Sequence, residues 1–223
     1  MTGSDRERWR CRLRGFGPLA LLAIVVILLG NFLFIPLSAI LVLLWAHLSG
    51  TPWRNLGFVR PANWGLTIAT GVIFGALLKL IMKSVVMPLV GADPVNQAFR
   101  FLQGNAGALP GMLYAVIIGA GFGEETLFRS FAFERLRTLL GNGIIATVFT
   151  VVATSAWFGA AHFGLQGMPG VQQATIVGLI FGTIFAATRQ IPMLMIAHAA
   201  FDVTAVALIY WRLETVVAHW FFS

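Results

Sequence analysis

Five long apolar runs constrain what this chain can fold into. They lie near residues 66–90, 111–133, 144–164, 171–188 and 192–211. A helix needs about 20 such residues to cross the roughly 30 Å hydrocarbon core of a bilayer, where only helices and closed barrels satisfy their backbone hydrogen bonds. The pattern therefore predicts an all-α fold, a polytopic transmembrane bundle of about six to seven membrane helices once the opening segment is added.

The opening apolar stretch, residues 18–48, is difficult to fit as a single crossing. As one helix it would be about 46 Å long at 1.5 Å per residue. It is also interrupted by Asn31 and by Pro36, which breaks helical hydrogen bonding. Both a single tilted pass and a pair of short or re-entrant passes stay open at this point.

Arginines in the connecting segments favour an even number of crossings before residue 49. Five arginines crowd into residues 6–14. Cytoplasmic flanks of membrane proteins carry an excess of Lys and Arg. An even number of crossings, or a re-entrant pair, would put this cluster on the same side as Arg54, Arg60, Arg135, Arg137 and Arg189. The sequence therefore predicts a cytoplasmic N-terminus.

The composition excludes several classes of protein. Hydrophobic residues make up 58% of the chain and charged residues 10%, whereas soluble domains carry roughly 25% charged residues. Disordered proteins, nucleic-acid-binding domains and ordinary soluble enzymes are thereby excluded, and the bilayer is the expected partner in place of nucleic acid. We expect an integral membrane protein of a bacterial or archaeal plasma membrane. Its parts would be an Arg-rich cytoplasmic tail (1–17) and a single transmembrane domain (18–223).

Glycine pairs at four-residue spacing occur in three of the apolar segments. Small residues at this spacing let helix backbones approach closely in lipid. We expect packing between helices of the same chain, with dimerisation as the alternative. The pairs are Gly71/Gly75, Gly119/Gly123 and Gly178/Gly182.

Ionisable side chains within the apolar runs are the candidates for chemistry, because each costs roughly 2.5–3.5 kcal/mol to insert. Two of them, Lys79 and Lys83, share a helix face; we expect them to snorkel to the interface, with lining of a polar cavity as the second interpretation. The others are Glu124, Glu125, Arg129, His162, His198 and Asp202.

The adjacent acids at 124 and 125 have different expected roles. On a helix Glu125 and Arg129 share a face and can form an ion pair. Glu124 points about 100° away and is free for another task. The spacing predicts a structural carboxylate at 125 and a working one at 124; the alternative is a solvated acidic pair at a helix end.

Two histidines add to this set from other apolar runs. Phe158 precedes His162 by one helical turn, and His198 and Asp202 share one face. Polar groups buried in a membrane need polar partners, and these groups are the partners available. The sequence therefore predicts one shared polar site.

Three motifs in this order resemble the signature of the CAAX protease and bacteriocin-processing (CPBP, or Abi) family, which includes the type II CAAX prenyl endopeptidase. The resemblance covers roughly residues 53–205, the core of the domain. It implies an intramembrane endopeptidase with a cavity open to the cytoplasm, acting on a peptide or protein substrate that is prenylated or membrane-embedded. The motifs are E-E-x-x-x-R at 124–129, F-x-x-x-H at 158–162 and H-x-x-x-D at 198–202.

The resemblance also implies residue roles. Glu124 with His162 would activate the attacking water, and His198 with Asp202 would act on the oxyanion. The prenyl endopeptidases usually have Asn where this chain has Asp202, and an ionised Asp cannot donate to an oxyanion. It could instead orient His198 by accepting its other ring proton, which puts a prenylated substrate in doubt. The supporting residues would be Glu125, Arg129 and Phe158.

Metal content and rival functions stay open. No cofactor is favoured, although Glu124, His162 and His198 could ligate zinc with one open position, and no His-Glu-x-x-His motif is present. The lone Cys11 excludes a multi-cysteine site. The main alternative function is a non-catalytic membrane scaffold or bacteriocin self-immunity protein of the same family. A small transporter would predict internal pseudo-symmetry, which the sequence lacks.

Overall fold

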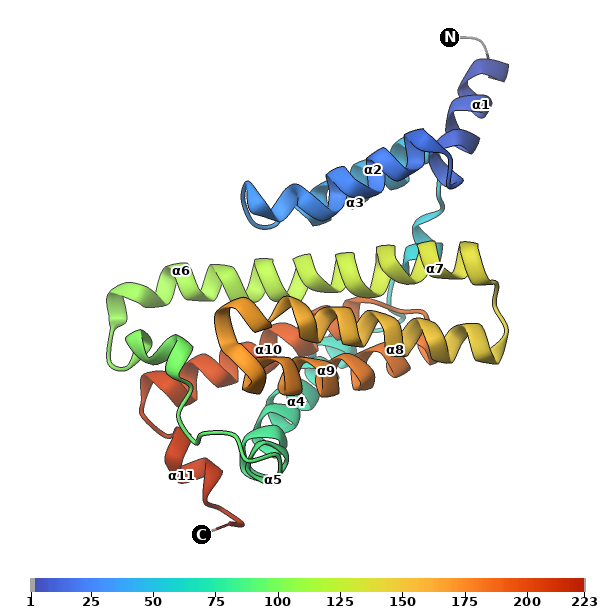
Figure 1. Ribbon diagram of the computed structural model, residues 1–223. Helices are drawn as coiled ribbons and strands as arrows, with labels where there is room; N and C mark the ends of the chain where they lie inside the picture. Colours follow the sequence, from blue (N-terminus) through green and yellow to red (C-terminus); the bar gives the residue numbers. More distant parts are fainter. Residues whose placement is uncertain (1–2, 223) are drawn as a thin grey trace.

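The computed structural model describes residues 3–222, and this part of the chain is a bundle of helices without strands (Figure 1). Five helices are long and apolar enough to cross a membrane, or six if the bent pair α1–α2 counts as one span. The predicted polytopic all-α bundle is confirmed, with the number of spans at the low end of the expectation. The α-helices are α1 (Gly3–Arg14), α2 (Pro18–Leu29), α3 (Leu37–Ser49), α4 (Trp64–Ile81), α5 (Met87–Leu89), α6 (Leu109–Tyr114), α7 (Ala132–Leu140), α8 (Ile144–Ala161), α9 (Phe163–Thr188), α10 (Pro192–Tyr210) and α11 (Glu214–Ala218). Between them lie η1 (Gly30–Phe32), η2 (Trp53–Leu56), η3 (Met82–Val86), η4 (Gln97–Leu102), η5 (Ala106–Ala108) and η6 (Ala115–Phe131).

A single rod organises the bundle. From η5 through α6 and η6 to α7 the chain is helical without a break, over 35 residues (Ala106–Leu140). The rod runs from α6 on the left of Figure 1 to α7 on the right, with α3 on one side and α10 on the other. Helices α8 and α9 pack on each other, and α4 packs across α10. Of the three helices that carry the predicted motifs, η6 contacts both α10 and α8.

The opening apolar stretch forms a helical hairpin of α2 and α3. Its turn contains Asn31 and Ser38, which exchange hydrogen bonds: Asn31 N to Ser38 Oγ at 3.0 Å and Ser38 N to Asn31 Oδ1 at 2.9 Å. Its two ends meet, because Arg14 Nε donates to the carbonyl of Ser49 at 2.7 Å. The chain therefore enters and leaves this hairpin at the same end of the bundle, as an even number of crossings or a re-entrant pair requires.

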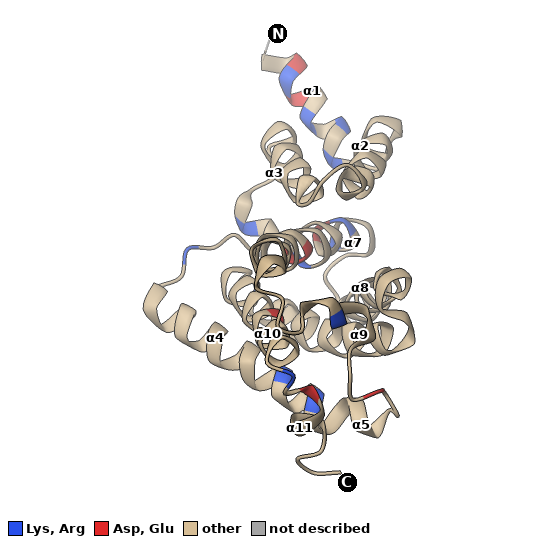
Figure 2. Cartoon of the chain, turned by 90° about the vertical axis from the view of Figure 1, so that its left-hand side faces the viewer, with Lys and Arg blue, Asp and Glu red and all other residues tan. Residues whose placement is uncertain are grey.

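Loop arginines gather at that same end. Arg135 Nη1 donates to the carbonyl of Arg14 at 2.7 Å, and Arg189 Nη2 to that of Asn55 at 3.0 Å. Arg137 and Arg189 line one surface pocket. In Figure 2 basic residues stand along α1 and beside α7. We call this end, where the arginines meet the base of the hairpin, the arginine end.

The three glycine pairs face other helices of the same chain. A Cβ atom at Gly75 would lie 2.0 Å from the carbonyl oxygen of Ala197 in α10. One at Gly119 would lie 2.8 Å from Ile35 at the hairpin tip, and one at Gly178 would lie 3.1 Å from Ser155 in α8. The prediction of packing within the chain is confirmed, and these close approaches fix how deeply the motif helices lie against their neighbours.

Candidate active site

The carboxylates at 124 and 125 lie in η6, halfway along the rod. Glu125 is fully buried, and its Oε1 lies 3.0 Å from Nη1 of Arg129, which is 2% exposed. The guanidinium of Arg129 also stacks over the Phe158 ring, 4.5 Å from its centroid. The predicted ion pair between Glu125 and Arg129 is confirmed, and it is sealed by an aromatic ring from α8.

Glu125 has a second partner on α10. His198 Nδ1 donates to Glu125 Oε1 at 2.7 Å. The other ring nitrogen, Nε2, faces two carboxylates, with Glu124 Oε2 at 3.7 Å and Asp202 Oδ2 at 3.6 Å. The expectation that Asp202 orients His198 is therefore corrected, because Glu125 occupies the orienting position at Nδ1 and Asp202 lies on the opposite side of the ring.

His162 follows the last residue of α8. Its Nδ1 donates to the carbonyl of Phe158, one turn earlier, at 2.8 Å. In the neutral ring this leaves Nε2 as a hydrogen-bond acceptor. The Phe158 ring lies between the two histidines, 4.7 Å from His162 and 5.9 Å from His198, both edge to face. Phe158 thus spaces the two imidazoles apart, which fits its predicted supporting role.

A cavity of about 330 Å³ joins these groups. It is bounded by η6, α8, α9 and α10, and the hairpin tip contributes Asn31 and Ile35 to its wall. The structure therefore brings all four predicted catalytic side chains to a single space inside the bundle. They are Glu124, His162, His198 and Asp202.

Comparison with known proteins agrees with the family resemblance that the three sequence motifs carry. Residues 106–204 match the family model described as type II CAAX prenyl endopeptidase Rce1-like. This match supports the CAAX protease family for the chain. No curated protein and no solved structure matched. The matched range contains all three motifs, and the match together with the apolar helices supports a membrane-embedded protease at the level of the family.

A second cavity, of about 400 Å³, adjoins the first. The side chains of Lys79 and Gln173 line both cavities, and Lys79 Nζ donates to Gln173 Oε1 at 2.9 Å. Lys83 lines the second cavity only, with Nζ 3.1 Å from Glu214 Oε1. Both lysines are buried. The expectation that they snorkel is wrong, because they line polar space within the bundle.

Two residues of this polar space were absent from the sequence-based set, Gln173 and Glu214. A signal for Glu214 existed, because a lysine in an apolar run needs a counterion. Few acids remain outside the motifs and the N-terminal tail. Nothing in the sequence distinguishes Gln173 from its neighbour Gln172.

A zinc site does not fit these side chains as they stand. In the described residues, 3–222, no three His, Cys, Asp or Glu side chains are grouped to hold a metal ion. We therefore derive no reaction step through zinc.

Proposed function

We propose that this protein is an intramembrane endopeptidase that hydrolyses a peptide bond with a water molecule activated by Glu124 and His162. One observation carries the proposal: the two adjacent carboxylates have separate surroundings. Glu125 is held between Arg129 and His198, whereas Glu124 faces the cavity. A carboxylate that has no structural partner within hydrogen-bond distance, beside an imidazole and a cavity, suits a general base.

The reaction would begin with a water molecule between Glu124 and His162. Glu124 takes one proton from the water while the water oxygen attacks the scissile carbonyl. Nε2 of His162 accepts a hydrogen bond from the other O–H of this water and fixes its position. The same carboxyl group then returns the proton to the leaving amine. This sequence uses one group as base and then acid.

The oxyanion would form on the other side of the cavity, near His198. Glu125 accepts a hydrogen bond from Nδ1 and fixes the plane of the ring. With both ring nitrogens protonated, Nε2 is also a donor and gives its hydrogen bond to the oxyanion. Preorganised donors of this kind supply about 2.7–4 kcal/mol each in other hydrolases. Asp202 lies beside Nε2, and as a neutral acid it would supply a second donor.

The test compares Glu124→Gln with wild type in membranes of the native host. Substrates should accumulate uncleaved in the variant, and turnover should fall by about 10²–10⁴-fold because the base is lost. His162→Ala should act in the same direction. The matched control is Glu7→Gln, an exposed glutamate in the tail. An unchanged membrane proteome with Glu124→Gln would favour the non-catalytic scaffold or self-immunity protein.

Zinc content distinguishes the metal-free reaction described above from a zinc-dependent one. The purified protein should cleave its substrate after treatment with a strong chelator. Stoichiometric zinc, together with activity that chelation removes and zinc restores, would contradict the reaction described above.

A further inference from the structure

The depth of the site follows from two contacts of the rod. Near one end Arg135 reaches the chain at Arg14, and near the other the Tyr114 hydroxyl donates to the carbonyl of Ile35 at the hairpin tip, 2.9 Å away. Between Tyr114 and Arg135 the rod runs for 21 residues, about the number that a helix needs to cross a bilayer core. Glu124 lies about halfway, so the reacting groups sit near the middle of the membrane.

From this depth the cavity extends in one direction only. Its outer wall is formed by Asn96, Phe99 and Met112, and by Leu165 after the end of α8. The adjoining cavity is lined by the same loop, from Ala92 to Ala98. Neither is lined by a residue of the segments 50–63, 135–143 or 189–191. Both cavities therefore open at the end of the bundle that lies opposite the arginine end.

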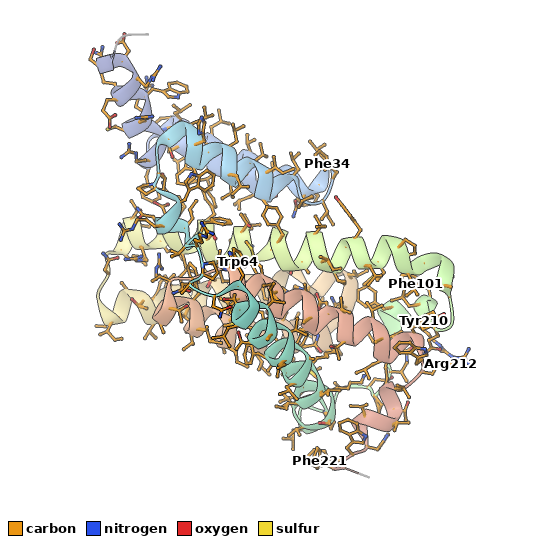
Figure 3. All side chains as sticks on the ribbon, turned by 180° about the vertical axis from the view of Figure 1, so that it is seen from behind. Phe34, Trp64, Phe101, Tyr210, Arg212 and Phe221 are labelled. Atoms are coloured by element: carbon orange, nitrogen blue, oxygen red, sulfur yellow. The ribbon has the colours of Figure 1, made fainter. Side chains whose placement is uncertain are left out.

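Figure 3 shows this second end directly. Phe101, Tyr210 and Arg212 lie together there, and the hairpin tip with Phe34 points to the same side. A backbone hydrogen bond from Gly104 N to the carbonyl of Tyr210, at 3.0 Å, ties the loop to the end of α10. We call this end the cavity end.

Basic residues are distributed very unequally between the two ends. The chain has 15 Lys and Arg. Three of them, Lys79, Lys83 and Arg129, lie within the bundle. The loops of the cavity end carry two, Arg100 and Arg212, and the arginine end carries the other ten. Because short cytoplasmic flanks hold the excess of Lys and Arg, this bias puts the arginine end in the cytoplasm.

We propose that the catalytic cavity opens on the extracytoplasmic side of the membrane. The opening to the cytoplasm implied by the family resemblance is then reversed in this chain. The substrate class rests on the proposed proteolytic function: it is the extracytoplasmic part of a membrane-anchored protein, and a prenylated protein in the cytoplasm could not reach the site.

The hairpin tip explains why the substrate is anchored in the membrane. Ile35 lines the cavity, and beside it Phe32 and Leu33 are 85% and 80% exposed. In a membrane-spanning chain, apolar side chains exposed to this degree mark contact with lipid. A substrate can therefore approach the cavity sideways from the outer half of the bilayer.

The native cysteine provides the first arm of the test. Cys11 is exposed, and it lies in α1 at the arginine end. In spheroplasts expressing the protein, a membrane-impermeant maleimide should leave Cys11 unmodified until detergent is added. This arm requires no substitution, so a folding defect cannot obscure it.

The second arm uses a cysteine at the cavity end. In a Cys11→Ser background, Gln97→Cys should react in intact spheroplasts, because Gln97 is an exposed residue of the loop that lines the second cavity. The matched control, Asn142→Cys at the arginine end, should react only after detergent. Labelling of Cys11 or Asn142→Cys in intact spheroplasts, or protection of Gln97→Cys there, would overturn the proposal.

This labelling does not depend on proteolysis. If Glu124→Gln leaves cleavage unchanged while the labelling pattern holds, the proposed function fails and the orientation stands. The reverse result, lost cleavage with the opposite labelling pattern, would leave the protease and place its substrate in the cytoplasm.

Discussion

The Nδ1 atom of His198 lies 2.7 Å from Oε1 of Glu125, and this contact joins α10 to the rod inside the bundle. The same oxygen lies 3.0 Å from Arg129 Nη1. One buried carboxylate therefore neutralises a guanidinium four residues along its own helix and fixes an imidazole on another helix. Glu125 is a positioning residue as well as a structural one.

Removing either member of the Glu125–Arg129 pair should destabilise the protein strongly. Glu125→Ala and Arg129→Ala each leave a buried charge without its partner, at a cost of about 3–5 kcal/mol. The double variant should lose much less stability than the two single variants lose together, because neither charge of the pair then remains. Unfolding in detergent micelles, measured for all four proteins of the cycle, gives the coupling energy. Additive losses would show that the two side chains do not stabilise each other.

The contact with His198 predicts a separate effect on catalysis. Glu125→Gln keeps an oxygen that can accept the Nδ1 proton but removes the charge. The folded fraction of this variant should retain KM while kcat falls, because the orientation of the ring matters in the transition state more than in substrate binding. Glu134→Gln, on the same rod but outside the cavity, is the matched control. An unchanged kcat in Glu125→Gln would reduce Glu125 to a structural role.

Asp202→Asn should keep most of the activity, since Glu125 already orients His198 and an amide supplies the N–H donor that a neutral carboxylic acid would supply. The two proteins should differ in their pH–rate profiles. Wild-type activity should fall as rising pH ionises Asp202, because a carboxylate cannot donate to the oxyanion, and this limb should be absent in Asp202→Asn. A loss in Asp202→Asn as large as that in Glu124→Gln would contradict the donor role.

Contacts within one helix could be predicted from the sequence, because helical geometry alone decides them. Glu125 and Arg129 are four residues apart and therefore meet wherever the helix packs. Asn31 and Pro36 likewise predicted the break in the opening stretch, and the hairpin turns there. Proline has no backbone N–H, so Pro36 interrupts the helical hydrogen bonds whatever surrounds it.

Contacts between helices could not be predicted in the same way. Whether His198 meets Glu125 or Asp202 depends on how α10 is rotated against the rod. That rotation is fixed by the close approach of Gly75 to Ala197 and of Gly121 to Ala199. The motif spacing carries no information on this angle.

The two buried lysines should respond differently to substitution. Lys83 is paired with Glu214, whose Oε1 also accepts from Asn96 N at 3.0 Å. Lys83→Met leaves that buried carboxylate without its cation and should cost about 3–5 kcal/mol of stability. Lys79 contacts no carboxylate in the described residues and donates to Gln173, so Lys79→Met should cost about 1–3 kcal/mol. Equal shifts of the thermal unfolding midpoint would show that Lys83 and Glu214 are not a stabilising pair.

The approach of α4 to α10 gives a prediction with a matched control in the same chain. A methyl group at Gly75 would meet the carbonyl oxygen of Ala197 at 2.0 Å, and Ala197 directly precedes His198. Gly75→Ala must therefore push the helices apart, with an expected cost of about 1–3 kcal/mol and a loss of turnover as His198 moves away from Glu125. Gly111→Ala adds the same methyl group to the rod where no atom lies within 4 Å, and it should gain about 0.5–1 kcal/mol from the better helix former. The thermal unfolding midpoint and the turnover of both variants, measured in the same detergent, test this prediction. Gly75→Ala with wild-type stability and wild-type turnover would show that this glycine does not set the position of the catalytic helix.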